Sequence, residues 1–182
     1  TTGCPAHTDA RGYGTMAGGG KWQEGQDVLR KTYPFVATLG RVCPAPCEKS
    51  CSRGFTGPEP ISIRKLKRVY SDWESTLPEK DRFSYEEYCC KQPLNGKSVG
   101  IVGAGPAGYQ CAMLLRSWGF ACHIYEMKDI PGGFLTLGIP KYRLPRQVVN
   151  EEMERIHSLP GITLQLSTEI GNDVSFEELE QK

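Results

Sequence analysis

The chain has 182 residues, a formal net charge of +1 at pH 7 and 24% charged residues. This balance argues against nucleic acid or an anionic membrane as the main partner, and no apolar run approaches the length of a membrane span. There is no signal-peptide pattern, and the eight cysteines include four in a metal-like pattern near prolines, so we expect a reducing, cytoplasmic location rather than a secreted disulfide scaffold. The sequence begins without Met, which leads us to expect a piece of a longer protein.

The first half of the chain predicts an all-α region that ends near the turn Pro93–Gly96. Helices are expected from Asp9 towards Met16 and over residues 22–31, 61–73 and 81–88. Asp9 is a suitable N-cap, and Ser84 and Glu87 have the spacing of a capping box. The third of these helices carries a basic patch, which we interpret mainly as a solvated face; it consists of Arg64, Lys65, Lys67 and Arg68.

Three regularly spaced cysteines, Cys43, Cys47 and Cys51, form the first chemical feature. The prolines around Cys43 make a helix start unlikely there, so we expect the run to begin as a loop. Cys4 is also followed by proline and lies far away in sequence. Four thiolates suit a cubane cluster and equally a Cys4 zinc site. Because Cys-x-x-Cys pairs are absent from this set, the spacing favours iron–sulfur, with zinc and unliganded thiols as the alternatives.

The second chemical feature follows a Val- and Ile-rich run that predicts a buried parallel strand. It is a glycine-rich motif, made up of Gly103, Ala104, Gly105, Pro106, Ala107 and Gly108. Gly103 would make the tight turn, Gly105 would let a pyrophosphate approach the backbone, and Gly108 would let the following helix pack closely on the sheet. The free N–H groups of that helix would face the anion.

The context of this motif indicates a dinucleotide-binding α/β fold rather than an ordinary turn. A helix up to Gly119 is followed by a strand over residues 121–125 and by Glu126, whose carboxylate would accept hydrogen bonds from ribose hydroxyls. A second glycine turn, Pro131–Gly133, is either a ligand-binding loop or a plain one. A helix from Pro145, a strand over residues 162–166 and a helix at Phe176 complete the predicted elements.

These motifs resemble the glutamate synthase small (β) subunit family, which includes the N-terminal part of dihydropyrimidine dehydrogenase. The residues that carry the resemblance are the glycine motif with Glu126, the turn Pro131–Gly133, the segment Gly138–Pro145, Cys4-Pro5 with Asp9, and Gly40–Pro44. The resemblance covers nearly the whole chain. It implies an all-α plus α/β organisation, with a helical [4Fe-4S]-binding domain over residues 1–93 and part of a Rossmann-like FAD-binding domain over residues 97–182.

The resemblance also implies roles for individual residues. The glycine motif would hold the pyrophosphate of FAD and Glu126 its ribose. The remaining cofactor contacts are expected from Gly132, Gly133 and Phe134 at the flavin, Arg143 close to the cofactor, and Ile170 at the adenosine. The cluster ligands would be Cys4, Cys43, Cys47 and Cys51, and no acid–base catalyst is expected.

One departure from the family concerns Lys67, which stands where some members complete a cluster with Glu or Gln. A protonated lysine has no lone pair to give. The simplest arrangement is one cluster on the four cysteines. The alternative is that Cys51 serves a second cluster whose other ligands precede Thr1.

The implied function is electron transfer in an NAD(P)H-dependent oxidoreductase, from NAD(P)H through FAD to a [4Fe-4S] cluster and a partner redox subunit. The family places its NAD(P)H domain after the position of Lys182, so residues 1–182 alone are not expected to oxidise NAD(P)H. Two alternatives stay open. One is an NAD(H)-binding dehydrogenase domain with a structural zinc site. The other is a non-catalytic relay or assembly module of a larger complex.

Overall fold

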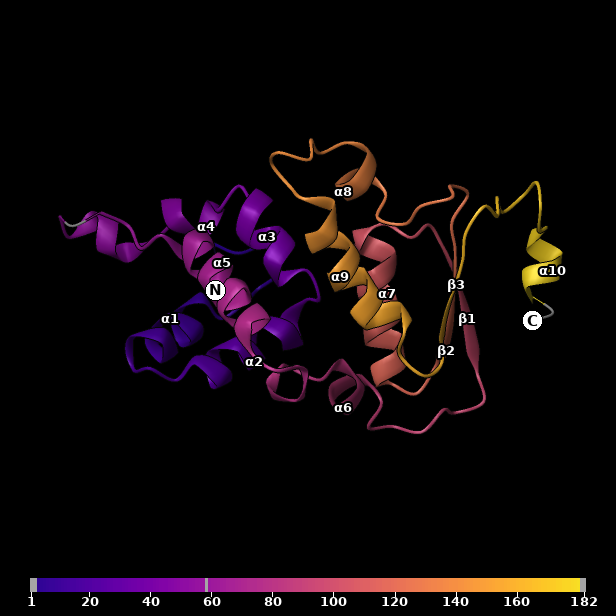
Figure 1. The fold of residues 1–182 in the computed structure, drawn as a ribbon, viewed down its shortest axis with the longest axis horizontal. Coiled ribbons are helices and arrows are strands. Elements are labelled where there is room, and N and C mark those ends of the chain that lie inside the picture. The colour runs from indigo at the N-terminus through magenta and orange to yellow at the C-terminus, as the bar shows by residue number, and fades with distance from the viewer. Residues whose placement is uncertain (1–2, 58, 181–182) are drawn as a thin grey trace. The chain divides into compact units, whose positions relative to one another are not determined.

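The structure is a computed structural model that describes residues 3–57 and 59–180. The chain divides into two compact units, Thr1–Phe83 and Ser84–Lys182 (Figure 1). Helix α6 (Tyr85–Cys89) belongs to the second unit, so the division comes before the boundary expected at residues 93–97. Within the described ranges, no helix is both long enough and apolar enough to cross a membrane.

The first unit is helical. It contains the helices predicted near residues 9–16, 22–31 and 61–73 and also helices that were not predicted, whereas the helix predicted over residues 81–88 is α6 of the second unit. The elements of the first unit are α1 (Ala10–Gly18), α2 (Trp22–Thr32), α3 (Val36–Val42), α4 (Pro46–Lys49), the 3-10 helix η1 (Ser52–Phe55), α5 (Ile63–Thr76) and the 3-10 helix η2 (Glu79–Asp81). Asp9 caps α1 as expected, because its carboxylate accepts a hydrogen bond from the Gly12 N–H at 2.9 Å. Helix α3 was not predicted.

The cysteine run does begin as a loop, but the expectation that proline would prevent a helix start there is wrong. Pro46 is the first residue of α4, a position where its missing N–H would have had no helical partner anyway. Ala45, the residue before it, has a left-handed backbone with φ +53°. The chain therefore turns sharply between Cys43 and Cys47.

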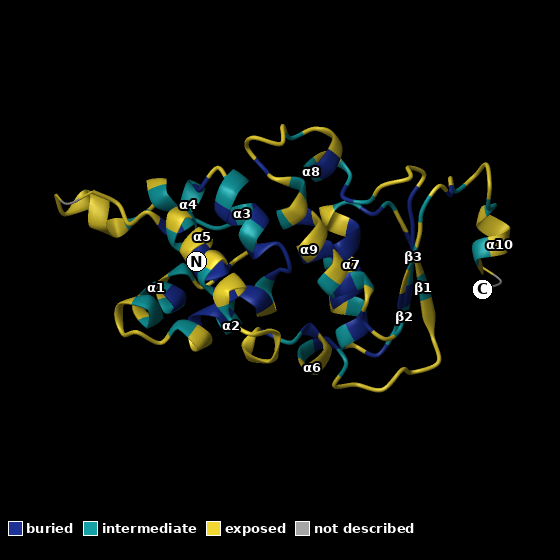
Figure 2. Cartoon of the chain, viewed as in Figure 1, coloured by how far each residue is buried: buried dark blue, intermediate teal, exposed yellow. Residues whose placement is uncertain are grey.

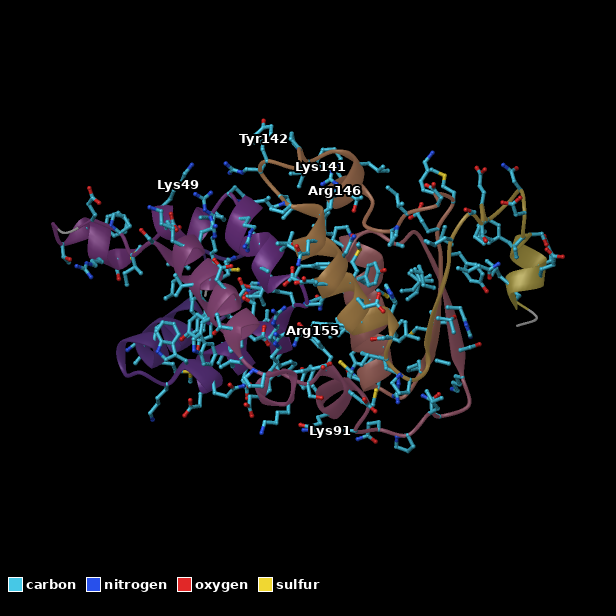
Figure 3. All side chains as sticks on the ribbon, viewed as in Figure 1. Lys49, Lys91, Lys141, Tyr142, Arg146 and Arg155 are labelled. Atoms are coloured by element: carbon cyan, nitrogen blue, oxygen red, sulfur yellow. The ribbon has the colours of Figure 1, made fainter. Side chains whose placement is uncertain are left out.

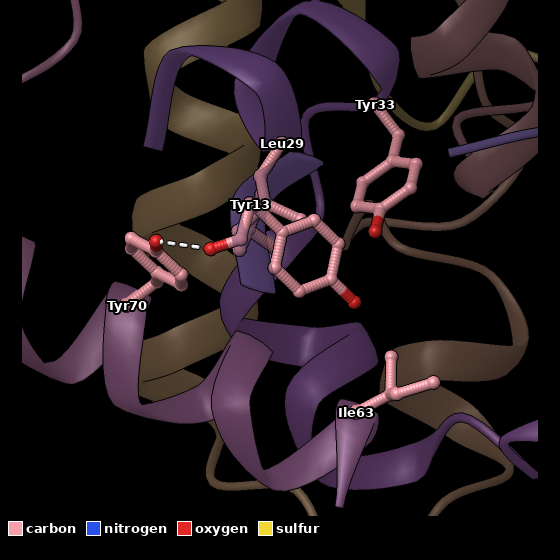
Figure 4. Close-up of a cluster of buried hydrophobic side chains, with 6 residues drawn as sticks. Tyr13, Leu29, Tyr33, Ile63 and Tyr70 are labelled. Atoms are coloured by element: carbon pink, nitrogen blue, oxygen red, sulfur yellow. Dashed lines mark hydrogen bonds between the residues drawn. The ribbon is translucent and has the colours of Figure 1, made fainter. Parts of the chain in front are cut away.

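The core of the first unit is aromatic (Figure 4). Its buried members are Tyr13, Leu29, Tyr33, Val36, Ile63 and Tyr70, named here the aromatic cluster. The Tyr70 hydroxyl donates to the Tyr13 carbonyl at 2.7 Å. A side chain at Gly25 would overlap the Tyr70 side chain, so glycine at this position allows α2 to pack closely against Tyr70 of α5.

Helices α3 and α5 pack unusually closely. A Cβ on Gly40 would lie 2.8 Å from the backbone N and Cα of Arg68, closer than real Cβ contacts allow. Glycine at this position therefore brings α3 directly against α5. The close approach places the end of α3, and with it Cys43, beside the start of α5. The Arg64 guanidinium completes the junction by donating to the Cys43 carbonyl at 3.1 Å.

A buried ion pair links α2 to α5. Arg30 and Glu74 pair with side chains only 3% exposed, and the Arg30 Nε donates to Glu74 at 3.1 Å. The same carboxylate accepts hydrogen bonds from Gln26 at 2.8 Å and from the Phe83 N–H at 3.1 Å. A buried charge is tolerated only when it is paired and hydrogen-bonded, and Glu74 meets both conditions.

We expect Arg30→Met to lower the free energy of unfolding by about 3–5 kcal/mol, because it leaves the Glu74 carboxylate buried without its cation. Denaturant unfolding followed by circular dichroism measures this loss. The matched control is Asp27→Asn, which removes an exposed pair with Lys31 and should cost no more than about 1 kcal/mol. Equal losses in the two variants would contradict the assignment of stability to the buried pair.

The second unit is a Rossmann-like α/β layer structure with a small parallel sheet. Its elements after α6 are β1 (Ser98–Val102), α7 (Pro106–Ser117), β2 (Ala121–Tyr125), α8 (Phe134–Leu137), α9 (Arg146–His157), β3 (Ile162–Gln165) and α10 (Phe176–Glu180). The strands are parallel in the order β1-β2-β3, with Ser98 opposite Ala121 and Cys122 opposite Ile162. The three predicted strands are confirmed as parallel strands, but the expectation that the first of them is buried is wrong, because only Ile101 of the five β1 residues is buried. Helix α8 was not predicted.

Helices α7 and α9 lie on one face of this sheet, and α10 lies on the other (Figure 1). Several residues of α7 are buried, among them Ala112 and Met113, whereas no residue of α10 is buried (Figure 2). Ser175 caps α10 in a full capping box: its hydroxyl accepts from the Glu178 N–H at 3.2 Å, and the Glu178 carboxylate accepts from the Ser175 N–H at 2.8 Å.

Candidate functional site

The carboxyl ends of β1 and β2 border a cavity of about 540 Å³, together with residues 168–170 of the segment that follows β3. In an open parallel sheet this edge is where ligands bind. Six predicted cofactor residues line the cavity: Gly103, Gly105, Glu126, Gly133, Phe134 and Ile170. The structure therefore brings together residues that lie up to 67 positions apart in sequence.

The glycine motif has the local geometry expected of a phosphate-binding turn. Gly103 has φ +100°, which a residue with a side chain rarely adopts. Gly105 is the N-cap of α7, and Pro106 begins that helix. A Cβ on Gly108 would collide with the Gly103 carbonyl, so glycine is required for the helix to start this close to the turn. The open N–H groups of the first turn of α7 favour an anion.

Glu126 is buried and is held in place by backbone donors. Its carboxylate accepts from the Ala104 N–H at 2.9 Å and from the Lys128 N–H at 3.0 Å. An ionised carboxylate can accept about four hydrogen bonds, so capacity remains for the hydroxyls of a ribose. The bond to Ala104 also ties the end of β2 to the glycine motif.

The turn Pro131–Gly133 packs onto the glycine motif. The Gly132 N–H donates to the Ala104 carbonyl at 2.7 Å, and a Cβ on Gly133 would lie 3.2 Å from the Gly105 Cα. Beyond the turn, α8 presents Phe134 and Leu137 to the cavity with exposed fractions of 74% and 57%. The sequence-based prediction missed Leu137 and Lys128 as lining residues, because neither belongs to a recognisable motif.

Six predicted cofactor residues do not line this cavity, and all but one of them belong to the two glycine turns: Ala104, Pro106, Ala107, Gly108, Gly132 and Arg143. Arg143 is the one that lies outside both turns. Its side chain is exposed, and its N–H donates to the Pro140 carbonyl at 2.9 Å within a turn. Figure 3 shows the neighbouring Tyr142 projecting outward from this loop, in line with its exposed fraction of 90%. The role expected for Arg143 stays a prediction.

Three of the four predicted cysteine ligands are neighbours in the first unit. Cys47 packs against the aromatic cluster and interacts electrostatically with Cys4 and Cys43. The Cys43 sulfur accepts a hydrogen bond from the Ala45 N–H at 3.4 Å, and the Cys4 thiol donates to the Thr8 hydroxyl at 3.5 Å. We call Cys4, Cys43 and Cys47 the three-thiol site.

Cys51 has different surroundings from these three. Its thiol is held chiefly by backbone hydrogen bonds from Ile61 and Arg53, and these lower its pKa. Cys51 and Cys47 both border a second cavity, of about 420 Å³. Whether Cys51 joins the same cluster or another therefore stays a prediction.

Burial and a nearby cation change the pKa values of thiols in the three-thiol site. At Cys47, burial raises the pKa of the thiol. At Cys4, burial also raises the pKa, but hydrogen bonds with Thr8 and the Ala6 backbone outweigh it, so that the pKa is lowered. The positive charge of Lys67 lowers the pKa of both thiols. Because metal ligation uses the thiolate form, Lys67 favours the ligating state.

The chemistry of the three-thiol site fits an iron–sulfur cluster, because thiolates are the ligands that such clusters use. Among residues 3–57 and 59–180, no three His, Cys, Asp or Glu side chains form a group that could hold a single metal ion. The Tyr33 hydroxyl is buried, and it interacts with the Thr8 side chain and electrostatically with Cys4, Cys43 and Cys47. Figure 4 shows it on the same side of the aromatic cluster as the Tyr13 hydroxyl. Hydrogen bonds to the sulfurs are one of the factors that set the reduction potential of a cluster.

Comparisons with known proteins agree with this two-part organisation. Residues 1–78 match the family described as dihydropyrimidine dehydrogenase domain II, 4Fe-4S cluster, and residues 101–146 match the NAD(P)-binding Rossmann-like domain. The chain is 36% identical to the NADP(+)-dependent formate dehydrogenase subunit beta of Moorella thermoacetica and 38% identical to the NADPH-Fe(3+) oxidoreductase subunit beta of Geobacter sulfurreducens, in each case over 98% of its length. It is 33% identical to the glutamate synthase [NADPH] small chain of Bacillus subtilis over 100% of its length.

The chain spans 27%, 26% and 35% of these three relatives, respectively. The matches nevertheless extend over both of its units. The resemblance to the glutamate synthase small-subunit and dihydropyrimidine dehydrogenase family is therefore confirmed, with residues 1–78 matching its 4Fe-4S domain and residues 101–146 matching a Rossmann-like NAD(P)-binding domain.

Proposed function

We propose that this chain is the electron-transfer part of an NAD(P)H-dependent oxidoreductase, with FAD in the second unit and a [4Fe-4S] cluster in the first. Bound FAD would accept a hydride from NAD(P)H and release single electrons, which is chemistry that the cofactors supply. A partner redox subunit or domain would receive those electrons.

The observation that carries the proposal is the cavity of about 540 Å³ at the carboxyl edge of the sheet. The glycine motif there supplies open N–H groups for a pyrophosphate, and Glu126 supplies acceptors for a ribose. Phe134 and Leu137 expose an apolar surface in the same cavity, which suits the flat ring system of a flavin. This combination favours FAD over a dinucleotide held only at its adenosine half.

In this proposal the residues of the chain bind and orient rather than exchange protons. The N-terminal end of α7 would neutralise the pyrophosphate. The turn Pro131–Gly133 would fix the far side of the cavity, because Gly132 is hydrogen-bonded to Ala104. In the first unit, Cys4, Cys43 and Cys47, with Cys51 as the expected fourth ligand, would hold the cluster. Burial beside the aromatic cluster would keep water away from it.

A second candidate is NAD(P) in the same cavity, favoured by the match of residues 101–146 to an NAD(P)-binding family. The two candidates differ in colour and in the nucleotide that is released. FAD gives two resolved visible absorption bands, whereas NAD(P) gives none.

The test is a visible spectrum of the protein purified without oxygen, followed by denaturation, chromatography of the released nucleotide, and iron and acid-labile sulfide assays. We expect FAD, together with iron and sulfide in equal amounts and a broad absorption that reductant bleaches. A colourless protein that contains zinc, or one that releases NAD(P), would contradict the proposal.

A further inference from the structure

The basic patch of α5 divides into exposed and buried cations. Lys65 and Arg68 are exposed, and Arg68 pairs with Asp72 at 3.3 Å. Arg64 is half-buried and donates to the Cys43 carbonyl. Lys67 is only 5% exposed. The solvated-face interpretation therefore holds for Lys65 and Arg68 and is wrong for Lys67.

The Lys67 side chain is largely buried, and no Asp or Glu among the described residues pairs with its ammonium. Its nitrogen lies 5.6 Å from the centroid of the Tyr33 ring. Burying a cation without an anionic partner is costly, and a cation–π contact offsets only part of that cost. An additional anionic group next to Lys67 would remove this imbalance.

The three-thiol site is where that anion would lie. Lys67 acts electrostatically on the Cys4 and Cys47 thiols. One turn earlier on α5, Ile63 belongs to the aromatic cluster against which Cys47 packs. The Tyr33 hydroxyl is buried, and Cys4, Cys43 and Cys47 all act on it electrostatically. A positive charge and a buried O–H group thus lie close to thiols that would be thiolates when they ligate metal.

We propose that Lys67 is the charge-compensating residue of the three-thiol site, where it raises the reduction potential of the cluster. This inference rests on the proposed function. Uptake of one electron adds one negative charge at the site and makes or breaks no bond, and Lys67 is the buried cation placed to compensate it. An ammonium has no lone pair, so Lys67 acts by charge and not as a ligand. Net charge and hydrogen bonding are two established determinants of cluster potential.

The experiment is a potentiometric titration of the iron-loaded protein, followed by electron paramagnetic resonance, with dithionite as the reductant. We expect Lys67→Met to shift the cluster potential to a more negative value and Lys67→Arg to stay near the wild type. Tyr33→Phe, which removes only the hydroxyl, should give a smaller shift in the same direction. The matched control is Lys65→Met on the exposed side of α5, which should leave the potential unchanged.

An unchanged potential in Lys67→Met with full iron content would overturn the inference, as would an equal shift in Lys65→Met. If Lys67→Met does not retain its iron, the other two variants test the inference. A large shift of the cluster potential in Lys67→Arg would overturn the inference, and so would a wild-type potential in Tyr33→Phe. A wild-type protein without iron would overturn the proposed function itself. The two failures are therefore distinguishable.

Discussion

Replacing Cys47 with serine is expected to remove most of the iron and acid-labile sulfide from the purified protein while its nucleotide content stays unchanged. Cys47 is the member of the three-thiol site that packs against the aromatic cluster, and a hydroxyl is a far weaker ligand for iron than a thiolate. Even residues that only support a metal ligand change affinity by about 10–100-fold, so we expect at least a tenfold loss of bound iron. The nucleotide cavity belongs to the other unit and should keep its ligand.

The matched control is Cys111→Ser, an exposed cysteine of α7 in the second unit. Its iron content should equal that of the wild type. Unchanged iron in Cys47→Ser would show that the three-thiol site does not hold the cluster. Cys51→Ser measured in parallel decides between the two arrangements left open, since an equal loss of iron would indicate one cluster on four cysteines.

Gly105→Ala is expected to weaken nucleotide binding, whereas Gly108→Ala is expected to lower stability, although the two glycines are three residues apart in one motif. A Cβ on Gly105 meets nothing within 4 Å, so the fold should tolerate it, but the methyl group would stand where a pyrophosphate approaches. We expect at least a tenfold loss of nucleotide affinity, or about 1.4 kcal/mol, with little change in stability. A Cβ on Gly108 collides with the Gly103 carbonyl, which should lower the free energy of unfolding by about 1–3 kcal/mol.

Isothermal titration of the nucleotide-free protein and denaturant unfolding of each variant separate these two effects. Gly14→Ala on α1 is the control, because a Cβ there also meets nothing within 4 Å and lies in the other unit. Should Gly105→Ala bind the nucleotide as tightly as the wild type, the cavity at the sheet edge would not be the pyrophosphate site.

The α/β half was largely predictable because its signals are local and ordered along the chain. Strand, glycine motif, helix and acidic residue follow one another, and each step constrains the next. The short helix α8 was not predictable, since four residues carry no periodicity. Its two apolar side chains, Phe134 and Leu137, become lining residues only through the turn that precedes them.

In the helical half, the sequence predicted where most of the longer helices lie but not how the cysteines and Lys67 are arranged around the site. Spacing identified the cysteines, but the different surroundings of Cys51 come from the backbone of Arg53 and Ile61, and Ile61 comes next to this thiol only in the fold. The burial of Lys67 could not be predicted from the sequence either. In sequence it is one of four cations on a helix, and only the fold distinguishes the buried one.

The backbone bond between Gly132 and Ala104 has a kinetic consequence for ligand capture. It holds the two glycine turns together, so that Gly105 and Gly133 line the same cavity in fixed relative positions. A cavity that needs little ordering loses little conformational entropy when it is filled. Association of the dinucleotide should therefore follow a single fast phase whose rate rises linearly with concentration, without a slow step for loop closure.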